Sequence, residues 1–187
     1  MVTQRLTDFS QIEMLYQKYL KKDFSPDERK PLYIMKNSWN KNEYECYGLF
    51  DGKKTAGYAF FVRTGGDCLL DYFAIAEDRR GEGLGSLFLR QLAECMQGIS
   101  CVVCEVENPE ASGNEEDRKQ RERRLRFYLR NGFRESALTS VLFGVNYRIL
   151  EFPTDREHTL EELRRIYTEL YRNSIPASLF RTQLLVN

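Results

Sequence analysis

The sequence has no excess of charge of either sign, since its 187 residues include 28 lysines and arginines and 28 aspartates and glutamates. A balanced charge removes the electrostatic attraction that binders of nucleic acid or anionic membranes normally show. Long apolar runs are also missing: the longest, YAFFV at residues 58–62, is far shorter than the roughly 20 residues that span a bilayer. With no secretory signal either, we expect a soluble, cytoplasmic protein without a nucleic-acid or membrane partner.

Histidine is almost absent, and the five cysteines show no metal-site pattern. His158 has no cysteine or second histidine at ligand spacing, so we expect it to be exposed near a helix start. Cys101 and Cys104 lie in a β-branched run that favours a strand, where residues three apart point to opposite faces. We therefore predict no metal site and reduced cysteines that are buried or half-buried, including Cys46, Cys68 and Cys95.

No linker, repeat or low-complexity tract divides the chain, and 42% of its residues are apolar. This length and composition favour one domain. We predict a domain at residues 1–153, with a helical extension at 154–187 packed on it.

Hydrophobic periodicity and capping signals predict the order of the elements. Strands are expected at 2–6, 43–50, 54–62, 68–76, 99–107, 137–143 and 145–152, and helices from Ser10, from Ser25 towards Trp39, at 84–96, at 114–132 and from Thr159. This order predicts an α/β fold with one mixed, largely antiparallel sheet flanked by helices.

The stretch RRGEGLGS at residues 79–86 places three glycines between an expected strand and an expected helix. A helix start with free N–H groups and a positive dipole end is an anion cradle, and glycines let a ligand approach the backbone. The spacing matches neither the G-x-x-x-x-G-K-[ST] nor the G-x-G-x-x-G nucleotide motif. It matches R-x-x-G-x-G from Arg80 to Gly85.

On this motif and on RFYLRNGF at residues 126–133, the sequence resembles the GNAT superfamily of N-acetyltransferases. The resemblance implies acetyl-coenzyme A as co-substrate, with its pyrophosphate held by the segment Arg80, Gly81, Glu82, Gly83, Leu84, Gly85 and Ser86. It also implies that the backbone of Phe73, Ala74 and Ile75 pairs with the pantetheine arm, and that Tyr128 protonates the departing thiolate.

Two features depart from the family pattern. Arg121 and Arg124 stand where many members have an asparagine and a small residue, which puts coenzyme contacts of that helix in question. The charged segment 108–123 is longer than the family's usual connection, and we consider a lid or a substrate-selecting role for it.

An acceptor amine must lose a proton before it attacks, and a carboxylate is the usual base. Asp71 is expected to share a strand face with Phe73 and Ile75, and Glu105 lies on the next strand together with Glu107. Asp71 and Glu105 are the stronger candidates, because the strand ends soon after Glu107.

The sequence thus predicts direct acetyl transfer from acetyl-coenzyme A to a primary amine of a small molecule or peptide, by a monomer or homodimer without a metal. One alternative is an inactive acyl-coenzyme A sensor or interaction module of the same fold. A weaker alternative is a dinucleotide-binding oxidoreductase, against which the glycine spacing counts.

Overall fold

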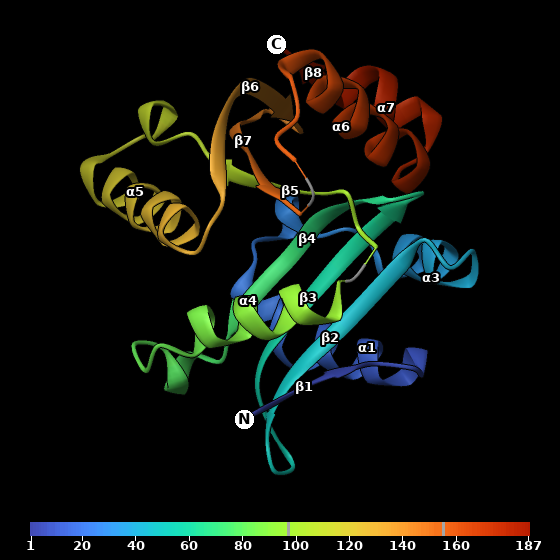
Figure 1. Cartoon of the computed structure of the whole chain (residues 1–187), viewed down its shortest axis with the longest axis vertical. Coiled ribbons are helices and arrows are strands. Elements are labelled where there is room, and N and C mark those ends of the chain that lie inside the picture. Colours follow the sequence, from blue (N-terminus) through green and yellow to red (C-terminus); the bar gives the residue numbers. More distant parts are fainter. Residues whose placement is uncertain (97, 155) are drawn as a thin grey trace. The chain divides into compact units, whose positions relative to one another are not determined.

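The structure is a computed structural model that describes residues 1–96, 98–154 and 156–187. The described residues fall into two compact units (Figure 1). Unit 1 contains residues 1–63 and 70–96, and unit 2 contains residues 64–69 and 98–187 apart from residue 155.

Unit 1 is built on strands in the order β1 (Val2–Arg5), β2 (Tyr44–Asp51), β3 (Lys54–Thr64) and β4 (Asp67–Ile75), of which residues 70–75 of β4 belong to this unit. The pairs β1–β2 and β2–β3 are antiparallel. A tight turn with Gly52 at φ 59° joins β2 to β3, which confirms the hairpin expected there. Both strands are buried over most of their length, and α3 packs against β2.

The helical segments of unit 1 are α1 (Phe9–Leu15), a π-helical turn (Tyr16–Leu20), α2 (Lys21–Asp23), a 3-10 turn (Pro26–Glu28), α3 (Leu32–Asn40), a second 3-10 turn (Glu77–Arg79) and α4 (Leu84–Cys95). Two predicted starts were wrong. The cap of α1 is Asp8, in a capping box with Gln11, instead of Ser10. The Ser25–Glu28 capping box exists but opens only a three-residue turn, and α3 begins after Pro31.

Unit 2 is built on strands in the order β5 (Cys101–Glu107), β7 (Val145–Pro153), β6 (Arg134–Leu142) and β8 (Leu184–Val186), and all three pairs are antiparallel. Its helical segments are a 3-10 turn (Pro109–Ala111), α5 (Glu115–Arg130), α6 (Leu160–Ser174) and α7 (Ala177–Gln183). Tyr128 of α5 contacts Cys104, and Tyr167 of α6 contacts Glu105. Because consecutive strand residues point to opposite faces, α5 and α6 cover opposite faces of β5.

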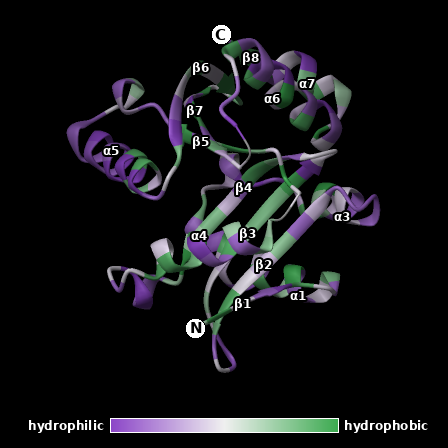
Figure 2. Cartoon of the chain, viewed as in Figure 1, coloured by the Kyte–Doolittle hydropathy of each residue, from purple (hydrophilic) through white to green (hydrophobic). Residues whose placement is uncertain are grey.

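The predicted α/β class, with largely antiparallel strands flanked by helices and an extra C-terminal helix, is confirmed. The extension also contains α7 and the strand β8, which the sequence analysis missed. Hydropathy differs between the elements: β3 is mostly apolar, whereas α5 is hydrophilic along most of its length (Figure 2). Within the described residues, no helix combines the length and the apolar character that crossing a membrane requires.

Candidate functional site

A turn that contains two glycines precedes α4. Gly81 and Gly83 have φ of 87° and 77°, a left-handed conformation that costs other residues roughly 1–2 kcal/mol. Gly83 is the N-cap of α4, and no side chain caps the helix there. Residues 81–83 are exposed, and the first N–H groups of a helix have no acceptor within it. This turn therefore presents backbone donors at the positive end of a 12-residue helix.

The other residues of the predicted cofactor segment are placed by their neighbours. Leu84 is buried, and Gly85 and Ser86 lie half-buried in the first turn of α4. The Glu82 carboxylate accepts a hydrogen bond from Nε of Arg79 at 3.0 Å. Glu82 can therefore contribute its backbone to an anion while its own charge is balanced by Arg79.

Arg80 connects the glycine turn to the end of β4. Its Nε donates to the Ile75 carbonyl oxygen at 3.0 Å, and its guanidinium pairs with Asp23 at 2.7 Å. Asp23 also accepts from the buried Tyr58 hydroxyl at 2.9 Å; burial first, and then this carboxylate, raise the pKa of Tyr58 above its usual range. Arg80 is thus fixed by two acceptors and holds the turn against the strand.

The end of β4 is packed against its neighbours but remains partly exposed to solvent. Phe73, Ala74 and Ile75 are half-buried, and the Phe73 ring stacks on Phe88 of α4 at 5.5 Å between centroids. A Cβ on Gly57 of β3 would lie 2.9 Å from the Ala74 carbonyl oxygen, so this glycine lets the two backbones approach.

Asp71 takes part in a buried ion pair. One carboxylate oxygen lies 2.6 Å from Nζ of Lys30, and the other accepts from the Tyr44 hydroxyl at 2.6 Å. The side chains of Asp71 and Lys30 are 6% and 13% exposed. Burial, with a smaller effect of this carboxylate, raises the pKa of Tyr44. Removing this carboxylate by mutation would leave the buried Lys30 ammonium without this partner, which is unfavourable.

Tyr128 is buried on α5 between aromatic rings, with Phe127 at 5.2 Å and Phe133 at 5.1 Å. Its hydroxyl donates to the Cys104 thiol. Burial, followed by the proximity of Cys104, raises the pKa of Tyr128 well above its usual range, so the phenol keeps its proton at neutral pH. A phenol in this state can act as an acid but not as a base.

Glu105 is half-buried on β5 and is held by α6. The Tyr171 hydroxyl donates to one carboxylate oxygen at 2.6 Å, and the Tyr167 hydroxyl donates to the other. Neither tyrosine was predicted from the sequence, although their spacing of four residues on a predicted helix was a usable signal, since such residues share a face.

Glu107 and the two arginines that depart from the family pattern form one cluster. Arg121 lies 3.3 Å and Arg124 2.7 Å from the Glu107 carboxylate, and Arg121 also pairs with Asp117 at 2.9 Å. These contacts dock α5 on the end of β5. The charged segment 108–123 is therefore a 3-10 turn followed by the first half of α5.

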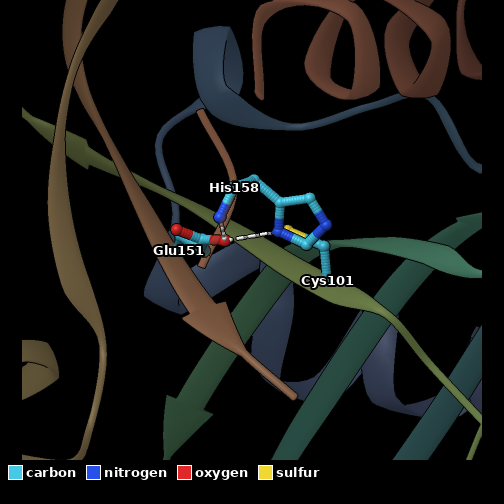
Figure 3. A group of neighbouring side chains, drawn as sticks. All are labelled: Cys101, Glu151 and His158. Carbon is cyan, nitrogen blue, oxygen red and sulfur yellow. Dashed lines mark hydrogen bonds and ion pairs between the residues drawn. The ribbon is translucent and has the colours of Figure 1, made fainter. Parts of the chain in front are cut away.

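His158 is buried, not exposed as predicted, and lies beside Glu151 and Cys101 (Figure 3). Its Nδ1 is 2.6 Å and its backbone nitrogen 3.0 Å from one oxygen of Glu151. Cys101 lies 4.0 Å from that same oxygen, and Arg134 pairs with the other. His158 follows Glu151 of β7 by seven residues, and the chain between them folds back so that the histidine contacts this strand. Cys95 also differs from its prediction, because it is exposed.

Replacing Glu151 by glutamine should lower the free energy of unfolding by about 2 kcal/mol, because the Arg134 charge loses its fully buried partner. Equilibrium denaturation in urea measures this. The matched control is Glu135→Gln, whose half-exposed ion pair with Arg148 at 2.6 Å should contribute less than about 1 kcal/mol. Equal losses in the two variants would contradict a special role for the buried network.

The predicted site residues thus fall into two groups. Asp71, the end of β4 and the glycine turn lie in unit 1, whereas Glu105 and Tyr128 lie in unit 2. Within unit 2, the Tyr128 hydroxyl and the Glu105 carboxylate lie on opposite faces of β5.

Comparison with known proteins identifies the fold. Residues 42–135 match the family described as the acetyltransferase (GNAT) domain. A structure from Bacteroides thetaiotaomicron, assigned to the GNAT acetyltransferases, has a TM-score of 0.75 and 18% identity over 94% of this chain and 100% of its own. No curated protein matches the sequence.

Two further solved structures have the same fold at lower similarity. The ribosomal-protein-S18-alanine N-acetyltransferase of Escherichia coli has a TM-score of 0.59 and 16% identity, covering 85% of this chain and 98% of its own. A GNAT acetyltransferase of Elizabethkingia anophelis with acetyl-CoA bound has a TM-score of 0.56 and 13% identity, covering 81% and 97%. The family match, which spans the glycine turn and Tyr128, shows that this chain belongs to the GNAT acetyltransferase family.

Proposed function

We propose that this protein transfers the acetyl group of acetyl-coenzyme A directly to a primary amine. The observation that carries the proposal is the exposed turn at Gly81 and Gly83, which presents backbone N–H groups at the start of α4. Coenzyme A contains a pyrophosphate, and a helix N-terminus without a side-chain cap is suited to bind it. Leu84, Gly85 and Ser86 would supply the first-turn donors, and Arg80 would keep the turn in place.

Attack of the amine on the thioester carbonyl forms a tetrahedral intermediate, and its collapse breaks the carbon–sulfur bond. We assign Tyr128 as the acid that protonates the departing thiolate, because it stands at the motif position to which the family resemblance assigns this role and its phenol carries a proton at neutral pH. In this role the hydroxyl would exchange its hydrogen bond with Cys104 for one to the thiolate sulfur. The Phe73 to Ile75 backbone would hold the pantetheine arm, with an N–H facing the thioester oxygen.

The acceptor amine needs a base, because an amine with a pKa near 10.4 is neutral in only about one molecule in 2,500 at pH 7. We assign this role to Glu105, directly or through water. The ion pair with Lys30 makes Asp71 the weaker candidate, whereas the contacts from α6 to Glu105 come from uncharged phenols. Asp71 then serves to hold the segment around Lys30 on β4.

The Tyr128 hydroxyl of α5 and the Glu105 carboxylate of β5 lie on opposite faces of that strand. The leaving thiolate and the attacking amine lie on different sides of the reacting carbon, so the acid and the base must reach it from different directions. We therefore assign the acid to the face of β5 that α5 covers and the base to the face that α6 covers.

Similar structures include a spermidine N-acetyltransferase chimera and an aminoglycoside 6'-N-acetyltransferase complexed with coenzyme A. A primary amine is common to these acceptors. The direct test is release of coenzyme A thiol from acetyl-coenzyme A over pooled amines, with polyamines, aminoglycosides, amino acids and peptides in separate pools. Thiol release in one pool supports the proposal. Acetyl-coenzyme A binding without thiol release in any pool would favour the inactive sensor instead.

Glu105→Gln should lower the rate about 100-fold at pH 7 and recover in part at pH 10, where free amine is plentiful. Asp71→Asn should mainly lower the free energy of unfolding, because it leaves the Lys30 charge without its carboxylate. Initial rates from pH 6 to 10 and thermal unfolding of both variants check this. Recovery at high pH for Asp71→Asn, but not for Glu105→Gln, would reverse the assignment.

A further inference from the structure

The helix α6 lies beyond residues 42–135, the part of the chain that matches the family, yet two of its side chains bind the carboxylate of β5. Tyr167 and Tyr171 are 0% and 1% exposed, and each donates its hydroxyl to a different oxygen of Glu105. The two rings also contact each other edge to face, at 5.0 Å between centroids. Together they form what we call the tyrosine clamp, Tyr167 and Tyr171.

The clamp is itself anchored. The Tyr167 hydroxyl lies 2.8 Å from the hydroxyl oxygen of Ser140 on β6, which is 1% exposed. The capping box of Thr159 and Glu162 opens α6, and its buried face includes Leu163, Ile166 and Leu170 besides the two tyrosines. A carboxylate bound at both oxygens by side chains of a packed helix has little freedom to rotate.

We propose that Tyr167 and Tyr171 are positioning residues that orient the Glu105 carboxylate and keep it ionised for proton removal from the acceptor amine. The inference rests on the proposed role of Glu105 as the base. Hydrogen bonds to an ionised carboxylate favour the ionised form. The clamp would therefore let Glu105 remain ionised at a lower pH than it would without the two hydroxyls. The C-terminal extension would then be required for catalysis by the family-matched part of the chain.

Among the described residues, the titratable groups around this carboxylate include the two phenols from α6 and the Cys104 thiol, which precedes it on β5. Tyr147 of β7 in turn interacts with Tyr167. Burial is the main cause that raises the pKa of both Tyr167 and Cys104 above their usual values. These two groups therefore stay neutral across the acid limb of a rate profile, where a carboxylate titrates.

The test uses the variants Tyr167→Phe and Tyr171→Phe, which keep the ring and remove the hydroxyl. Two quantities are measured in the full chain: the pH dependence of thiol release with the best amine of the pools, and the carbon NMR titration of the Glu105 carboxyl signal, assigned by its loss in Glu105→Gln. In each variant, both midpoints should move to higher pH by about one unit. The kcat at pH 8 should fall about tenfold, while KM for acetyl-coenzyme A stays unchanged.

Tyr47→Phe is the matched control, because the Tyr47 hydroxyl donates at 3.0 Å to another buried carboxylate, Glu45 on β2. It should move neither midpoint. If the NMR titration midpoint of Glu105 is unshifted in both folded clamp variants, the proposed positioning role of the tyrosine clamp is wrong. A shifted carboxyl signal with an unshifted rate profile would instead show that Glu105 is not the base. A parent protein without thiol release would overturn the proposed function itself.

Discussion

Replacement of Tyr128 by phenylalanine is expected to lower kcat about 100-fold and to leave the dissociation constant of acetyl-coenzyme A nearly unchanged. The hydroxyl is needed when the thiolate departs, and a general acid typically contributes a factor of 10² to 10⁴. Phenylalanine keeps the contacts with Phe127 and Phe133, so the buried packing of α5 is preserved. Initial rates of thiol release measure kcat, and calorimetric titration measures the dissociation constant of acetyl-coenzyme A.

The hydrogen bond to Cys104 provides a control for this result. Tyr128→Phe also leaves the buried Cys104 thiol without that donor, which costs some stability. Cys104→Ala removes the same hydrogen bond but keeps the phenol, and it should therefore retain most of the activity. If folded Tyr128→Phe has the same kcat as the parent protein, Tyr128 is not the acid and has only a structural role in the core.

The second large effect is expected at the glycine turn. Gly83→Ala should raise the dissociation constant of acetyl-coenzyme A at least tenfold, because φ of 77° disfavours a Cβ and the turn must move away from the geometry that presents its N–H groups. Apart from its chain neighbours, no heavy atom of the described residues lies within 4 Å of the added Cβ, so the loss comes from the backbone conformation rather than from a clash. The backbone strain should also lower the free energy of unfolding by about 1 kcal/mol.

Gly144→Ala is the matched control for this variant. Gly144 has a similar φ of 80° and equally open surroundings, but it lies in the turn between β6 and β7. It should show the same loss of stability and parental binding. Calorimetric titration together with urea denaturation separates the two effects. Parental affinity in folded Gly83→Ala would mean that the glycine serves only to form the turn.

Local patterns in the sequence were sufficient for most elements. The cap of α5 at Asn114 and the turn at Gly132, with φ of 92°, are where the charges and glycine predicted them. The segment from Ser25 to Trp39 was wrong, because a real capping box at Ser25 did not reveal that Pro31 starts a separate helix. The strand β8 was missed because its three residues form a strand only by pairing with β6.

In the candidate site, too, some features follow from the local sequence and others only from the tertiary structure. By itself, the sequence determined the family, the glycine turn and the tyrosine on α5, because these depend on the order and spacing of neighbouring residues. Only the tertiary structure decided that Lys30 neutralises Asp71, that α6 binds Glu105 and that His158 is buried beside Glu151. Those contacts join residues 41, 66 and 7 positions apart. Partners of a carboxylate are determined by which strands and helices pack together, and no local period of the chain records that packing.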